Sequence, residues 1–186
     1  MTDNTFIDPV RHWLETFVIE LNLCPFAKRE FINNRIRFQL SKATTEQQLI
    51  DDLQHELERL NHDKSIETTL LIHPHVLQNF YDYNDFLDLA DALLVQMQLE
   101  GIYQIASFHP DYHFAGTEID DVENYSNRSP FPLLHLIRED SLAEAVAHYP
   151  KPEHIPERNI ALLKKLGKDH IATVFKSHFK TNKDQE

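Results

Sequence analysis

The chain has 186 residues, of which 41% are hydrophobic and 26% are charged, and its formal net charge is -12. This length fits one domain with a sizeable core, and no apolar run approaches the roughly 20 residues that a membrane helix needs. The negative charge disfavours binding to the phosphate backbone of nucleic acids. With one cysteine and three glycines, the chain can form neither an internal disulfide, nor an all-cysteine metal site, nor a glycine-rich nucleotide-binding loop.

The N-terminal segment lacks the basic stretch, apolar core and cleavage site of a signal peptide. We therefore expect a soluble, cytoplasmic protein that binds neither membranes nor nucleic acid. One globular domain is predicted over residues 1–179, and residues 180–186 are predicted to form a disordered C-terminal tail. The sequence leaves the oligomeric state open.

Apolar residues at helical spacing predict a first helix over residues 8–21, which ends before Cys24-Pro25. Cys24 is expected at the N-cap of a short second helix. There the helix dipole, Lys28 and Arg29 would favour its thiolate, as in a nucleophilic or redox-active cysteine. A buried packing role is the alternative, because cysteine is among the residue types most often buried.

Three strands are predicted, over residues 35–42, 67–72 and 103–108. Two long amphipathic helices separate them, and the second of these helices is expected to begin at Asn84 or Asp85. Strands that alternate with helices indicate an α/β or α+β fold. We expect a small, mostly parallel sheet of at least three strands, covered by helices.

The second and third predicted strands both end in a histidine followed by proline, at His73-Pro74 and His109-Pro110. Ligands of parallel sheets collect beyond the carboxyl ends of the strands, so a site is predicted where the third strand ends. Simple termination of the strands by proline is the alternative for both segments.

Beyond the third strand, Ser129 is predicted to cap a helix. The N–H groups at the start of that helix, together with Arg128, could bind a phosphate or a carboxylate. On the same helix His135, Arg138 and Glu139 would share one face. Arg128 could instead pair with an acidic residue of the preceding loop, and His135 could be a core histidine.

Three segments, NLCPFA, ASFHPDY and ENYSNRSPFPLLHLIRED, resemble a bacterial family of unknown function, and the similarity extends from Leu14 to Ser141. The family name implies no reaction. His113 matches the pattern less clearly, which favours His109 with His135 over His109 with His113 as a functional pair. The resemblance implies that the signature positions are Cys24, Pro25, Phe26, His109, Pro110, Asn127, Arg128, Ser129, Pro130, His135, Arg138 and Glu139.

These observations predict an enzyme that acts on a small anionic metabolite, with catalytic roles for His109, His135 or Cys24. His109 and His135 could instead hold a divalent metal ion, namely iron, zinc or manganese. A Cys24-dependent thiol enzyme or redox sensor and a non-catalytic binding or adaptor protein are the alternatives. The residues predicted to bind the substrate are Asn127, Arg128, Ser129, Arg138 and Glu139.

Overall fold

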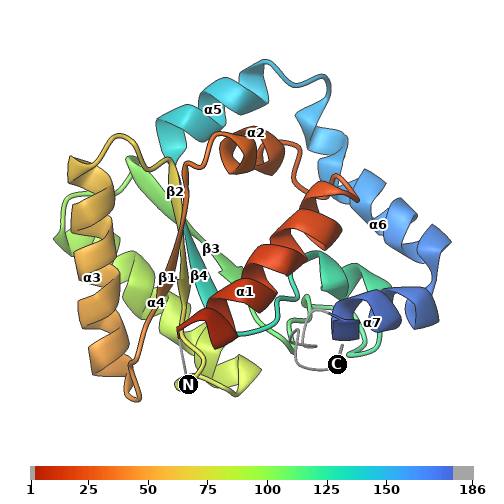
Figure 1. The fold of residues 1–186 in the computed structure, drawn as a ribbon, viewed down its shortest axis with the longest axis horizontal. Coiled ribbons are helices and arrows are strands. Elements are labelled where there is room, and N and C mark those ends of the chain that lie inside the picture. The colour runs from red at the N-terminus through yellow and green to blue at the C-terminus, as the bar shows by residue number, and fades with distance from the viewer. Residues whose placement is uncertain (1–2, 178–186) are drawn as a thin grey trace.

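Four strands form one open sheet in the order β1-β2-β4-β3, as shown by a computed structural model that describes residues 3–177 (Figure 1). β1 and β2 are parallel, whereas β4 is antiparallel to both of its neighbours, β2 and β3. The α/β fold predicted from the sequence is confirmed, and the three predicted strands run in one direction. The fourth strand lies between two of them and runs the opposite way. The strands are β1 (Ile36–Leu40), β2 (Thr68–Ile72), β3 (Tyr103–Phe108) and β4 (Leu133–Arg138).

β4 occupies the segment in which the sequence predicted a helix beginning at Ser129, so that prediction is wrong. A central strand is covered on both faces, and its sequence, LLHLIR, therefore lacks the alternation of polar and apolar residues that marks a half-buried strand. Ser129 and Phe131 each precede a proline, which favours extended backbone over helix. Because successive side chains of a strand alternate, His135 and Arg138 point to opposite faces of the sheet.

Helices α3 (Glu46–His62) and α4 (Phe80–Gln96) cover one face of the sheet. α4 begins earlier than the predicted start at Asn84 or Asp85, because the side chain of Asn79 accepts hydrogen bonds from the N–H groups of Tyr81 and Asp82. The core on this side is formed mainly by leucines and aromatic residues, among them Leu49, Leu53, Leu57, Leu71, Tyr83, Phe86, Tyr103 and Leu134.

The other face is covered by the N-terminal and C-terminal helices (Figure 1). The predicted first helix is present but starts earlier, and its second half is a π-helix. α2 and α5 lie at the edge of the sheet where β1 and β2 begin and where β4 ends. The elements of this side are α1 (Asn4–Trp13), the π-helix (Leu14–Ile19), α2 (Ala27–Ile32), α5 (Glu139–Ala147), α6 (Ile155–Leu166) and α7 (Lys168–Ser177), and two short 3-10 helices span Val122–Ser126 and Pro152–His154.

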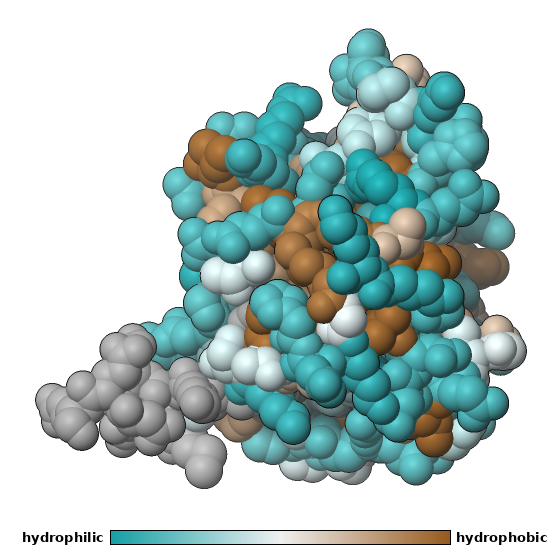
Figure 2. Space-filling model, turned by 90° about the vertical axis from the view of Figure 1, so that its right-hand side faces the viewer, coloured by the Kyte–Doolittle hydropathy of each residue, from teal (hydrophilic) through white to brown (hydrophobic). Residues whose placement is uncertain are grey.

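The face formed by α6 and α7 is mostly hydrophilic, with hydrophobic residues in patches between the polar ones (Figure 2). Within residues 3–177, no helix combines the length and the apolar character that a membrane span requires. The predicted tail, residues 180–186, lies outside the described residues.

Candidate functional site

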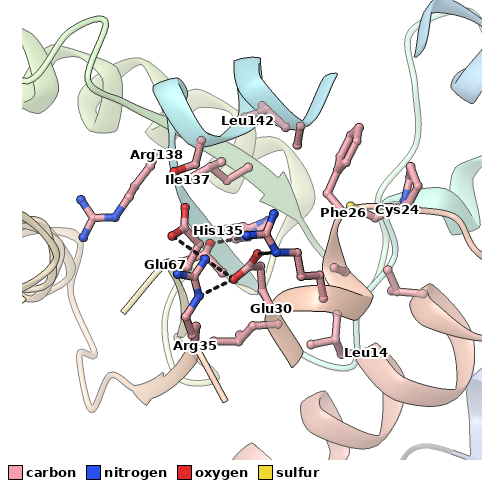
Figure 3. Close-up of a pocket in the computed structure, with 18 of the residues that line it drawn as sticks. Leu14, Cys24, Phe26, Glu30, Arg35, Glu67, His135, Ile137, Arg138 and Leu142 are labelled. Carbon is pink, nitrogen blue, oxygen red and sulfur yellow. Dashed lines mark hydrogen bonds and ion pairs between the residues drawn. The ribbon is translucent and has the colours of Figure 1, made fainter. Parts of the chain in front are cut away.

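A pocket of about 540 Å³ lies on the α1 side of the sheet, next to α2 and α5 (Figure 3). Its walls are mostly apolar and come from segments that are far apart in the sequence: Leu14 from the π-helix, Cys24 and Phe26 from the turn before α2, and Leu142 from α5. β4 contributes His135. The pocket therefore brings together Cys24 and His135, two of the three residues for which the sequence predicted a catalytic role.

His135 is held in one tautomer by Thr68 of β2. The Thr68 hydroxyl lies 2.6 Å from the carbonyl oxygen of Leu136 and 2.7 Å from Nε2 of His135. A carbonyl oxygen can only accept a hydrogen bond, so the Thr68 hydroxyl donates its single proton to the carbonyl of Leu136. It must therefore accept a hydrogen bond from His135. The hydrogen-bond network thus assigns the proton of the neutral ring to Nε2 and leaves a lone pair on Nδ1.

Burial keeps the His135 ring neutral, because removal from water disfavours the imidazolium and lowers its pKa to about 4. At neutral pH the ring is therefore a hydrogen-bond acceptor and a weak base. A general base that works near pH 7 needs a higher pKa, so the ring suits recognition better than proton abstraction.

The Cys24 thiol lines the same pocket, but its electrostatics differ from the sequence-based prediction. Burial raises its pKa, and this effect outweighs the backbone N–H groups of Phe26 and Ala27, which lower the pKa. The raised pKa agrees with the buried packing role that the sequence left as the alternative, and Phe26, rather than Cys24 as predicted, is the N-cap of α2. The thiol is protonated at neutral pH and is not activated as a nucleophile.

One wall of the pocket carries a cluster of ion pairs (Figure 3). Arg35 contacts Glu30 at 2.6 Å and Glu67 at 3.0 Å, and the side chains of both glutamates are only 15% exposed. Arg29 also approaches Glu30, at 3.5 Å, but its side chain is 77% exposed. The less exposed part of the wall therefore holds two carboxylates and one guanidinium.

The π-helix shapes the wall opposite the sheet. Its wider turns are seen in the hydrogen bonds from the N–H of Glu20 to the carbonyl of Glu15 and from the N–H of Leu23 to that of Val18. Leu14 and Val18 both line the pocket. π-helical turns are rare and are frequently found at functional sites.

His109 lies at the opposite edge of the sheet, where β3 ends, and is fully buried. Its Nε2–H donates to the carbonyl of Leu77 at 3.2 Å, and its Nδ1 accepts from the N–H of Asp111 at 3.0 Å. The ring packs against Phe80 and Tyr83. Burial lowers its pKa. Because both ring nitrogens are bonded to backbone, this histidine ties the end of β3 to the loop before α4.

The predicted anion-binding residues before β4 also form hydrogen bonds with backbone groups. The buried guanidinium of Arg128 donates to the carbonyls of Tyr112 and Ile119 and stacks on the ring of Tyr125. The Asn127 amide donates to a backbone carbonyl of β3, and the Ser129 hydroxyl donates to that of Phe131. These contacts fix the loop, and the described structure shows no helix N-terminus at this point.

Arg138 and Glu139 lie at the other end of β4, beside the pocket. The Arg138 guanidinium turns away from the pocket (Figure 3) and donates to the Tyr103 hydroxyl and to the carbonyls of Leu60, Asp63 and Ile66. Glu139 starts α5, and its backbone N–H donates to a carbonyl at the start of β3.

The structure does not bring His109 and His135 together. His135 shares the α1 face of the sheet with Leu70 and Ala106, whereas His109 packs on the α4 side. Among residues 3–177 there is no group of three or more His, Cys, Asp or Glu side chains that could hold a metal ion. Metal binding stays a prediction from the sequence alone.

Several residues of the pocket were not identified from the sequence. Glu67 and Thr68 lie at the start of the second strand, where three polar residues, including Thr69, come before a run of leucine and isoleucine. Glu30 and Arg35 carry no local signal, because their pairing depends on the turn between α2 and β1.

The comparisons with known proteins are consistent with the sequence resemblance. They find no match among curated proteins and none among solved structures. A family model described as "Protein of unknown function (DUF1415)" matches residues 5–173, which include every element that lines the pocket. The chain belongs to this family of proteins of unknown function.

Proposed function

We propose that this protein binds a small, largely apolar organic molecule in the pocket between the sheet, α2 and α5. The observation that carries the proposal is the pocket itself. Its volume of about 540 Å³ falls within the range typical of small-molecule sites, and its walls are mainly apolar with a few polar groups. The π-helix in the opposite wall is a second feature that is common at functional sites.

Binding explains the state of the pocket's reactive side chains better than catalysis by either of them. The Cys24 thiol is protonated because burial raises its pKa, and the His135 ring is neutral because burial lowers its pKa to about 4. Thiol chemistry at Cys24 is the second candidate, and it is favoured by the presence of an imidazole in the same pocket.

An enzyme for small anions at the end of β3, as predicted from the sequence, receives less support from the geometry. Arg128, the proposed anion-binding group, donates to two backbone carbonyls and is buried. Both nitrogens of His109 are likewise bonded to backbone. We therefore place the binding site on the opposite edge of the sheet.

The proposal is tested with prodan, a neutral naphthalene dye whose emission shifts to the blue in apolar surroundings. We expect saturable binding of prodan to the natural protein, with about one dye per chain. Ala145→Trp, which places an indole into the pocket from α5, should weaken binding about tenfold or more. Ala143→Trp adds the same indole to the exposed side of α5 and should leave binding unchanged.

Circular dichroism and thermal unfolding show whether both variants fold. If Ala145→Trp does not fold, Ala27→Phe fills the pocket from α2 instead. If neither prodan nor a naphthalene that carries a hydrogen-bond donor, such as 2-naphthol, binds saturably, or if the pocket-filling and control variants bind equally, a binding function for this pocket is refuted.

A further inference from the structure

We infer that the ligand of this pocket presents a hydrogen-bond donor to Nδ1 of His135, and that the ligand is an uncharged or cationic molecule with an apolar body. This inference rests on the proposed function, and it adds the chemical class of the ligand. It makes His135 a residue that determines specificity.

His135 can form a hydrogen bond to a ligand in one direction only. Thr68 holds the proton of the ring on Nε2, because its own proton is donated to Leu136. Nδ1 is therefore left as an acceptor. Burial opposes protonation of the ring, so Nδ1 does not become a donor near neutral pH.

Nδ1 of His135 faces open space. Three buried side-chain polar atoms lack a partner among the described residues, namely Nε1 of Trp13, Oγ1 of Thr69 and Nε2 of His73. Nδ1 of His135 is not one of them, and the described residues provide no hydrogen bond to it, so this atom is not enclosed by protein. Because His135 lines the pocket, the open space is that of the pocket.

Within the described part of the chain, the remaining walls of the pocket offer an anion no free partner. Glu30 and Glu67 both form ion pairs with Arg35, and Arg29 also approaches Glu30, so the guanidinium groups of this wall are already paired with its carboxylates. Trp13 also lines the pocket, but its indole N–H is enclosed by protein and cannot donate to a ligand in this arrangement. A carboxylate or phosphate would meet the lone pair of His135, while the nearby Arg35 is already paired with two carboxylates.

The acceptor at His135 and the apolar walls together define the class of ligand. Aromatic or aliphatic molecules with a hydroxyl, amide or amine group fit both the apolar walls and the acceptor at His135. A molecule of the same shape that lacks the donor leaves Nδ1 without a partner. Loss of a hydrogen bond to a buried group is expected to weaken binding about tenfold.

The experiment measures displacement of prodan at pH 7 by three molecules that share one ring system. 2-Naphthol carries a donor, 2-methoxynaphthalene carries the oxygen without the proton, and 2-naphthoate carries a negative charge. We expect 2-naphthol to bind about tenfold more tightly than the methyl ether, and more tightly still than the carboxylate.

His135→Phe keeps the ring shape and leaves Thr68 bonded to Leu136, so the variant should bind 2-naphthol and its methyl ether equally. His62→Phe is the matched control, because His62 is exposed at the end of α3, does not line the pocket, and contacts a carbonyl of its own helix through Nδ1. This control should keep the preference for 2-naphthol.

The outcomes separate the two proposals. If prodan binds in the pocket but 2-naphthol shows no preference over its methyl ether, or 2-naphthoate binds best, the inference about His135 is overturned and the binding function stands. Retention of the preference in His135→Phe would overturn it as well. If neither prodan nor the naphthalene compounds bind, both proposals fail.

Discussion

His73, at the end of β2, should make the stability of this protein decrease as the pH falls from 6.5 to about 4. The ring is fully buried and is stacked on Tyr83. Its Nδ1–H donates to the carbonyl of Val76 at 3.2 Å, while Nε2 has no partner among the described residues. Burial lowers its pKa from 6.5 to about 4, and the neighbouring His109 adds to this effect. Protonation of His73 is therefore strongly coupled to unfolding.

The sign of the effect follows from the two pKa values. The unfolded chain binds a proton at His73 near pH 6.5, whereas the folded chain resists protonation until about pH 4. The unfolded state thus binds more protons between these values, and stability falls as the pH falls through this window. His73 alone is expected to cost about 2 kcal/mol between pH 7 and pH 5, and about 3 kcal/mol by pH 4.

Urea unfolding at pH 7, 6 and 5 measures this dependence. His73→Phe removes the titrating group and keeps an aromatic ring against Tyr83, so the fall in unfolding free energy should shrink by about 2 kcal/mol. His55→Gln removes an exposed histidine of α3 and should leave the pH dependence unchanged. If His73→Phe shows the same slope as the natural protein, His73 is protonated in the folded state and the reasoning fails.

Two further predictions concern Arg138 and Cys24. Arg138→Met leaves three backbone carbonyls without their charged donor and should lower the free energy of unfolding by about 3 kcal/mol, measured by urea titration, whereas the exposed Arg29→Met should change it by less than about 0.5 kcal/mol. An equal effect of both substitutions would contradict the role of Arg138. Alkylation of Cys24 by iodoacetamide should be slow at pH 7, with a midpoint above the usual thiol range of about 8.5. Saturating prodan should slow the alkylation further. An alkylation midpoint below about pH 8.5 would instead support the alternative that the protein is a thiol enzyme.

Much of the fold could be predicted from the sequence because each layer has its own periodicity. α3 and the first three strands show clear helical or extended patterns, and each was placed to within a few residues. β4 was missed because a strand covered on both faces has no alternation, so its apolar run also fits a helix. The start of α4 was misplaced because Asn79 and Asn84 are equally good caps, and only the fold decides between them.

The candidate site was harder to predict because it depends on how distant segments meet. Cys24 and His135 are 111 positions apart in the sequence, and no local pattern indicates that they line the same pocket. The electrostatic prediction for Cys24 counted the helix N–H groups and two basic residues. The alternative prediction, a buried packing role, agrees with the structure, in which burial raises the pKa of the thiol.

β4 also explains why the pocket lies at an edge where sequence reasoning did not place a site. In a parallel sheet every strand ends at the same edge, and ligands collect there. Here β4 runs in the opposite direction, so its carboxyl end and α5 lie beside the beginnings of β1 and β2. The antiparallel strand thus places α5 at the edge where the parallel strands begin, and this edge does not usually carry the ligand site of a parallel sheet. At the ends of β2 and β3, the side chains of His73 and His109 are buried and form hydrogen bonds with backbone groups, so they are engaged in the fold.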